Sequence, residues 1–264
     1  MRIPDFMNRD DYLQNPIMRR FLKEHGLEFV ENRADYLKAI EEYAAKNSET
    51  KRETREWILK VVKEGSKEIC YRKIRGVSEW HRDPVLVEAK IKENYPDCPM
   101  KNILTYRNTG ECKMIEYKII TNNCNEVTRI DFTFSKLFLY GETGKDGDVT
   151  IFPVFIEVYL DEGFVISRGK AKSTLYQYDE HNHMLFGDYK VDTMDYAVSI
   201  IDKIIDMFEF ETDTNKKRIK NENSQMLYRL YEKYSFTPVD VVRKVESEEA
   251  VVNGFVNQVF DELQ

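Results

Sequence analysis

Short polar breaks divide residues 101–190 into segments in which β-branched and aromatic residues alternate with polar ones. This alternation is typical of strands that bury one face. The breaks suit the tight turns of antiparallel hairpins, whereas parallel strands need crossover connections of about a dozen residues or more. We therefore expect an antiparallel meander. Its expected strands are residues 112–121, 126–140, 150–160, 163–167 with a continuation towards Lys172, 174–178 and 184–189.

Helical signals surround this zone. The expected elements before it are a helix from Ser48 or Thr50 to Gly65, a strand at residues 68–74, and a helix that begins at Asp83-Pro84 and ends before Pro96. The expected elements after it are a helix from Asp192 or Thr193 with Ala197, Ile201, Ile204, Ile205 and Phe208 on its apolar face, a helix around Leu227, Leu230 and Tyr231, one capped by Thr237-Pro238, and a last one with Val251, Phe255, Val259 and Phe260.

The predicted fold class is therefore α+β, with a central antiparallel sheet flanked by helical regions at both ends of the chain. Residues 1–100 are expected to form a mainly helical N-terminal region. Residues 101–264 are expected to form the sheet and the helices that pack on it.

Two capped helices around a short extended link are expected at residues 15–44. Asn15 can cap the first helix, Pro16 is tolerated at its first position, and Gly26 can take the left-handed conformation that ends it. Asn32 can cap the second helix. The expected buried residues are Tyr36, Leu37, Ile40, Tyr43 and Ala44 in the second helix and Leu27, Phe29 and Val30 in the link.

The order of residues in this pair, Phe21-Leu22, Lys23, Gly26-Leu27 and then Tyr36-Leu37, resembles the SAP-type helix, extended link, helix module. The resemblance covers about a ninth of the chain. It implies DNA binding, with the expected phosphate contacts made by Arg19, Arg20, Arg33 and Lys38. The alternative is a packing or partner-binding module, because residues 1–50 hold eight basic and ten acidic residues and a DNA-binding module is usually basic.

Charge is unevenly distributed along the chain. Residues 51–118 contain 16 basic and 11 acidic residues, whereas residues 142–213 contain 6 basic and 16 acidic ones. This polarity is consistent with a nucleic-acid-binding face and an acidic back, with two surfaces that pair in a homo-oligomer, or with ordinary solvated charge.

Arg168, Lys170 and Lys172 occupy alternate positions of an expected strand, so their side chains should point to the same side. Such a strip suits phosphate contacts, especially if Lys113 and Lys118 lie on a neighbouring strand. The alternative is protection of an edge strand against aggregation, for which lysine is often used.

Candidate catalytic groups are few. Glu116 and Lys118 match the E-x-K half of the PD-(D/E)xK metal-dependent nucleases, in which a carboxylate holds Mg²⁺ and a lysine helps to activate water. The upstream aspartate has one candidate, Asp97, which lies in a Pro-Asp-Cys-Pro loop rather than at the start of a strand. The resemblance is therefore incomplete, and both charges can equally lie on a solvent-facing side of the strand.

Two further polar segments are expected to be turns. His181 and His183 could ligate a transition metal only with ligands from elsewhere in the chain. Residues 141–148 resemble a phosphate loop, but the glycine spacing is too short and Asp146 replaces the Ser or Thr that would bind Mg²⁺. We therefore predict no catalytic residue, no metal site and no cofactor.

Aromatic residues make up 12% of the chain, which is too many for a disordered protein. No apolar run approaches the roughly 18 residues of a membrane span, and the N-terminus lacks the apolar core of a signal peptide, so a cytoplasmic location is expected. The four cysteines, Cys70, Cys98, Cys112 and Cys124, form no C-x-x-C pair and are expected to be reduced thiols.

The sequence thus favours a non-enzymatic accessory protein that binds nucleic acid, with DNA as the first expectation. One alternative is an interaction or scaffold protein that self-associates through its aromatic sheet and acidic zone. The other alternative is a Mg²⁺-dependent nuclease that uses Glu116 and Lys118.

Overall fold

The computed structural model describes residues 2–8, 12–28, 32–65, 67–172 and 174–212, together with residues 218, 221, 224, 225 and 228. Contacts divide the chain into two compact units, Met1–Asp213 and Thr214–Gln264. The first unit contains all the features described below. The helices expected around Leu230, after Thr237 and around Phe255 lie outside the described residues.

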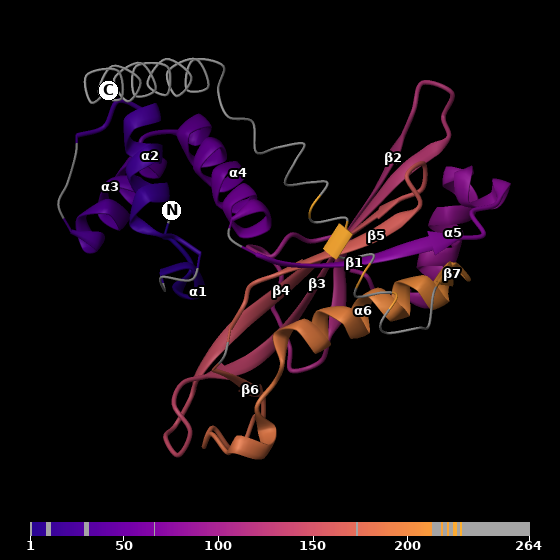
Figure 1. Ribbon diagram of the computed structural model, residues 1–264. Coiled ribbons are helices and arrows are strands. Elements are labelled where there is room, and N and C mark those ends of the chain that lie inside the picture. Colours follow the sequence, from indigo (N-terminus) through magenta and orange to yellow (C-terminus); the bar gives the residue numbers. More distant parts are fainter. Residues whose placement is uncertain are drawn as a thin grey trace, which may run out of the picture. The chain divides into compact units, whose positions relative to one another are not determined.

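A seven-stranded antiparallel sheet forms the centre of the first unit (Figure 1). Its strands are β1 (Glu68–Arg75), β2 (Lys113–Thr121), β3 (Val127–Tyr140), β4 (Asp148–Tyr159), β5 (Phe164–Gly169), β6 (Leu175–Gln177) and β7 (Glu211–Thr212). The strand order is β2-β3-β4-β5-β1-β7, and β6 pairs with β3. The predicted meander is confirmed from β2 to β5, where each strand pairs with the next one along the chain.

Local turn chemistry explains these hairpins. The side-chain oxygen of Asn122 accepts the backbone N–H groups of Cys124 and Glu126 at 2.9 and 3.0 Å, which closes the turn between β2 and β3. Gly163 adopts a φ of +68° between β4 and β5. The strand predicted at residues 184–189 is wrong, because residues 187–189 form a short 3₁₀ helix.

The helices are α1 (Asp5–Asn8), α2 (Asn15–Glu24), α3 (Arg33–Ala45), α4 (Ser48–Glu64), α5 (Pro84–Asn94) and α6 (Thr193–Met207), with 3₁₀ helices at Glu79–Arg82 and Gly187–Tyr189. The α+β class is therefore confirmed. Among the described residues, no helix is long and apolar enough to cross a membrane.

Helices α3, α5 and α6 begin at the predicted caps Asn32, Asp83 and Asp192, whereas α4 is capped by Asn47. Asn32 accepts the N–H of Asp35 at 3.0 Å, and Asp83 accepts the N–H groups of Val85 and Leu86. The predicted cap at Asn15 is wrong, because this residue is already helical and Gln14 occupies the capping position without a side-chain hydrogen bond. A Gln14 side chain has one methylene more than the short side chains preferred there.

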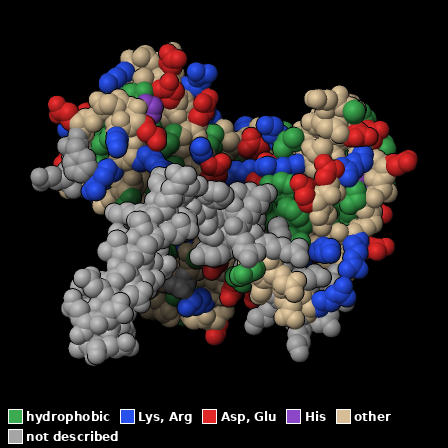
Figure 2. All heavy atoms as spheres, turned by 45° about the horizontal axis from the view of Figure 1, so that its top comes forward, with side chains coloured by type: hydrophobic (Ala, Val, Ile, Leu, Met, Phe, Trp, Pro, Cys, Tyr) green, Lys and Arg blue, Asp and Glu red, His purple; other side chains and the backbone are tan. Residues whose placement is uncertain are grey.

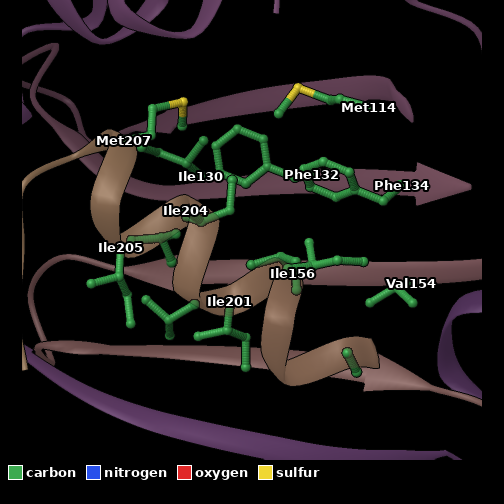
Figure 3. Packing of buried hydrophobic residues seen from close by; sticks show 14 of the residues in the cluster. Met114, Ile130, Phe132, Phe134, Val154, Ile156, Ile201, Ile204, Ile205 and Met207 are labelled. Atoms are coloured by element: carbon green, nitrogen blue, oxygen red, sulfur yellow. The ribbon is translucent and has the colours of Figure 1, made fainter. Parts of the chain in front are cut away.

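The two faces of the sheet bury different layers. Phe132 and Phe134 on β3 and Ile156 on β4 point towards α6, where Ile201 and Ile204 meet them (Figure 3). Helix α5 joins the same core through Val87 and Ile91. On the opposite face, α1 to α4 form a second core that reaches the sheet at Ile115 of β2 and Phe155 of β4, together with Ile103 of the turn before β2.

The division expected at residue 100 does not coincide with either unit. β1 pairs with β5, and α5 packs in the α6 layer, so residues 68–94 belong to the sheet and its cover. Hairpin signals alone do not reveal this pairing, because β1 and β5 are separated by most of the meander.

Candidate functional site

The face of the sheet that α1 to α4 cover only in part carries a mixture of charged and aromatic residues. Because directly paired residues of antiparallel strands project to the same side, the registers define three rows on it. They are Glu116, Thr133, Phe155, Arg168 and Ile69; Lys118, Asp131, Glu157, Ile166 and Tyr71; and Ile120, Arg129, Tyr159, Phe164 and Lys73. We call these three rows the open face.

A buried carboxylate organises the middle of the open face. The side chain of Glu157 is only 2% exposed, and it accepts hydrogen bonds from Arg129 at 3.0 Å and Arg168 at 2.9 Å. Its Oε1 also lies 3.0 Å from Nζ of Lys63, which reaches over from α4. Tyr159 donates to its other oxygen at 3.1 Å. Three cations therefore surround one buried anion.

Asp131 is the second anion of this network. It accepts two hydrogen bonds from Arg129, at 2.5 and 2.7 Å, and one from Lys63 at 2.9 Å. Burial opposes ionisation of Glu157 and Asp131, but the hydrogen bonds and positive charges around them outweigh it and lower the pKa of each. Both carboxylates therefore stay charged at neutral pH, and the five-residue network keeps an excess of positive charge.

The predicted strip of Arg168, Lys170 and Lys172 starts on this face, but it is not an exposed row. Lys170 and Lys172 are buried. Nζ of Lys172 lies 4.8 Å from the ring centroid of Tyr140 and 5.8 Å from that of Tyr12, a residue of the helical core. The cations thus enter the junction between the sheet and the N-terminal helices. The predicted continuation of the strand towards Lys172 is wrong, because β5 ends at Gly169 and leaves Lys170 and Lys172 beyond it.

Lys67, which precedes β1, joins the same junction. Its Nζ lies 5.1 Å from the ring centroid of Tyr12. Burial, followed by the positive charges of Lys170 and Arg168, lowers the pKa of Lys67 to about 8. Lys67, Lys170 and Arg168 thus lie close enough at this junction for their positive charges to repel one another.

Lys113 and Lys118 do not lie on a strand next to Arg168, because β3 and β4 separate β2 from β5. Lys118 nevertheless lies on the open face and is exposed. Figure 2, which turns this side of the molecule forward, shows a band of Lys and Arg side chains in the upper middle of the picture.

Three half-buried aromatic rings continue the open face across β4, β5 and β1. Tyr159 stacks on Phe164, with ring centroids 4.6 Å apart, and Phe164 lies 5.4 Å from Tyr71. The guanidinium carbon of Arg129 lies 5.0 Å from the Tyr159 ring centroid. Sequence reasoning missed this aromatic row, because its members come from three strands and meet only in the folded register.

A cavity of about 300 Å³ lies between α4 and the sheet, and Lys63, Glu116, Lys118 and Asp131 line it. Burial raises the pKa of Glu116, although the positive charge of Lys63 opposes the shift. Asp97, the other carboxylate considered from sequence, is exposed in a turn and does not line this cavity. In the described part of the chain, no cluster of three or more His, Cys, Asp or Glu side chains could hold a metal ion.

The basic residues of the α2–α3 pair have local partners. Arg19 donates to the hydroxyl of Tyr36 at 3.2 Å, and Arg33 donates to the Leu13 carbonyl at 2.5 Å. The exposed Arg20 and Lys38 each lie 3.9 Å from a glutamate one helical turn further on. Both helices are present, and Gly26 takes a φ of +62° as predicted. Phe29 and Val30 of the expected link lie outside the described residues. The relation of this pair to the SAP-type module stays a prediction.

The two other polar segments are turns. Residues 141–147 connect β3 to β4, with Tyr140 and Asp148 paired at the base of the hairpin. The N–H of Gly147 donates to the carbonyl of His183 at 2.8 Å, so this turn packs on the segment that contains both histidines. The N–H of His181 donates to Asp179 at 2.8 Å.

Comparisons of the chain with models of known protein families, with curated proteins and with solved structures found no match. The functional argument therefore rests on the chemistry of the open face.

Proposed function

We propose that the protein binds nucleic acid through the open face of its sheet, as a non-catalytic accessory protein. The observation that carries this proposal is the excess of positive charge on that face and at its junction with the N-terminal helices. Among the described residues placed there, the cations are Lys63, Lys67, Lys73, Lys118, Arg129, Arg168 and Lys170, and the carboxylates are Glu116, Asp131 and Glu157.

Acidic side chains of residues 192–207 lie on the other side of the sheet. Helix α6 packs on the opposite face and exposes Asp195, Asp202 and Asp206 to solvent. The net charge of −7 is therefore compatible with an electropositive binding face. Such separation steers a polyanion to one side of the molecule and keeps it away from the other.

Binding of labelled DNA and RNA, measured by fluorescence anisotropy over a salt series, tests the proposal. We expect affinity at low salt that falls linearly on a double-logarithmic plot, because phosphate contacts release counterions. No binding at low salt, or affinity that does not depend on salt, would contradict it. A Lys73→Gln, Lys118→Gln variant should bind more weakly, since both lysines are exposed on the open face.

The matched control is an Arg20→Gln, Lys38→Gln variant, which removes the same charge from the α2–α3 pair. If the open face is the binding site, this control keeps nearly all of the affinity. If the control loses affinity and the Lys73, Lys118 variant does not, the helical pair is the site instead.

A Mg²⁺-dependent nuclease is the second candidate, because the cavity brings Glu116 and Lys118 together with Asp131. The geometry supports it less well, since Arg129 and Lys63 already bind the Asp131 carboxylate. Plasmid nicking that requires Mg²⁺ and disappears in a Glu116→Ala variant would establish this activity. Nicking that persists in that variant would exclude the cavity as its source.

A further inference from the structure

We propose that Tyr159, Phe164 and Tyr71 form a stacking platform for the bases of a single-stranded nucleic acid. This inference rests on the proposed function, and it specifies which form of nucleic acid the open face binds. We call the three residues the aromatic row.

The aromatic row is not part of the packed interior. The aromatic residues of the opposite face, such as Phe132 and Phe134, are about 1% exposed and belong to the core under α6. Tyr159, Phe164 and Tyr71 are only half-buried and belong to none of the hydrophobic clusters formed by the described residues. Three neighbouring aromatic rings on a sheet face outside these clusters are an apolar surface suited to a flat ligand.

The rings form one continuous apolar strip across three strands. The three rings come from the adjacent strands β4, β5 and β1, so the row runs across the strand direction. Neighbouring strands lie about 4.8 Å apart. The ring centroids lie 4.6 and 5.4 Å apart, so Tyr159 and Phe164 cover part of each other's faces. A base therefore contacts the ring surface that these half-buried side chains leave exposed along the row.

In the third row of the open face, a cation lies on each side of Tyr159 and Phe164. Arg129 lies over the Tyr159 ring, and Lys73 pairs with Phe164 across β5 and β1. Arg129 is fixed in place by Asp131 and Glu157. A strand whose bases lie on the rings therefore has positive charge within reach of its phosphates, and ordered side chains need little rearrangement on binding.

These features favour a single strand over a duplex. Bases in a duplex are stacked on one another and offer no free ring face to a protein side chain, whereas unpaired bases can stack on aromatic rings. Stacking tolerates any base, so sequence preference should be weak. An acidic protein partner would use the same cations but would gain nothing specific from the rings.

The test compares Tyr159→Leu and Phe164→Leu with the wild-type protein on a labelled single strand and on a duplex of the same sequence. Leucine keeps an apolar side chain but cannot stack. We expect each change to lower single-strand affinity about tenfold while leaving the salt slope unchanged, because no phosphate contact is removed. Circular dichroism and thermal melting establish that the variants are folded.

Tyr159→Phe is the matched control. It keeps the ring and removes only the hydroxyl that donates to Glu157, so it should bind a single strand nearly as well as the wild-type protein. A Phe164→Trp variant supplies an independent readout. Because the wild-type protein already contains Trp57 and Trp80, the readout is the quenching in excess of that of the wild-type protein. This excess quenching should occur with an unlabelled single strand and not with polyglutamate at equal charge.

The outcomes separate this inference from the proposed function. Duplex affinity equal to or above single-strand affinity, with no effect of the leucine variants, would overturn the stacking platform and leave nucleic-acid binding intact. Quenching by polyglutamate would also overturn it, in favour of an acidic protein partner. Absence of binding to either nucleic acid would overturn the proposed function itself.

Discussion

Arg168 on β5 donates to Glu157 on β4, with Nη2 2.9 Å from Oε2. The contact is diagonal, since the Cα partner of Arg168 is Phe155 and that of Glu157 is Ile166. It links the basic segment that begins at Arg168 to the charge network in the middle of the open face. Arg168 thus neutralises a buried carboxylate. A bound polyanion would be attracted by the net charge of the whole network rather than by Arg168 alone.

Removal of that carboxylate should destabilise the fold. In a Glu157→Gln variant, the three cations around this position lose their buried counter-charge. Breaking one partner out of a buried ion pair costs about 3 to 5 kcal/mol, and we expect the lower end because the cations are partly exposed. Urea unfolding should show this loss. Asp161→Asn, which removes an exposed partner of Arg82, should cost less than about 1 kcal/mol, and equal losses in both variants would contradict the argument.

Lys67 should give the stability curve a distinctive dependence on pH. Its pKa is lowered to about 8 in the folded protein, so between pH 8 and its ordinary value of 10.5 the unfolded chain binds more protons. The contribution of Lys67 therefore destabilises the fold below pH 8, and this cost is relieved as the pH rises. A Lys67→Met variant should gain stability at pH 7, and its advantage over the wild-type protein should shrink towards pH 10.5.

The groups that face Lys67 make this comparison informative. Lys170 and Arg168 contribute positive charge, and Tyr12 lies beside it. Other groups, such as Cys70, titrate in the same range with pKa values raised by burial and lower the stability as pH rises. Only the difference between wild type and variant isolates Lys67. A difference that stays constant from pH 7 to pH 10.5 would exclude the lowered pKa.

Phosphate contacts from the exposed lysines predict the salt dependence of binding. Each contact to a single strand contributes about 0.7 to the slope of log affinity against log salt. The Lys73→Gln, Lys118→Gln variant should therefore reduce the slope by about 1.4, if each lysine contacts one phosphate. Anisotropy titrations from low to physiological salt measure this. A weaker affinity with an unchanged slope would indicate that the lysines act through folding rather than through phosphate.

Features that depend on neighbouring residues in the sequence could be predicted, and features that depend on register could not. Asn32, Gly26 and Asp83 mark helix ends because caps and left-handed turns are local interactions. The hairpins follow from short breaks for the same reason. The pairing of β1 with β5 and the position of α5 follow from long-range packing, which local signals do not contain.

The basic segment from Arg168 to Lys172 also combines a feature that the local sequence predicts with one that depends on long-range packing. Strand alternation applies to Arg168, but β5 ends at Gly169, so it does not extend to Lys170 and Lys172. The burial of both lysines depends on the surrounding structure, which for Lys172 includes Tyr12 and Tyr140. The Glu157 side chain also lies on a strand that otherwise reads as apolar, and its three cationic partners come from separate elements. The aromatic row likewise depends on the registers of β4, β5 and β1.

A change to glutamine should stabilise the protein at Glu116, whereas the same change at Glu157 should destabilise it. Burial raises the pKa of Glu116, so ionisation at neutral pH is a cost to the folded state, whereas ionisation of Glu157 stabilises it. Glu116→Gln removes that cost and should make the protein more stable at pH 7. Its advantage should shrink as pH falls towards the ordinary glutamate pKa of about 4.3, because the wild-type carboxyl is then protonated in both states.

Urea midpoints at pH 7 and pH 4.5 measure this effect, with Glu157→Gln as the matched comparison on the same sheet face. A loss of stability in Glu116→Gln at pH 7 would show that Lys63, whose charge favours the ionised form, dominates over burial. A gain would mark Glu116 as a carboxylate that the fold retains at the expense of stability. Such a residue in a cavity beside Lys63 and Lys118 is the position at which a change in nucleic-acid binding or cleavage should be sought next.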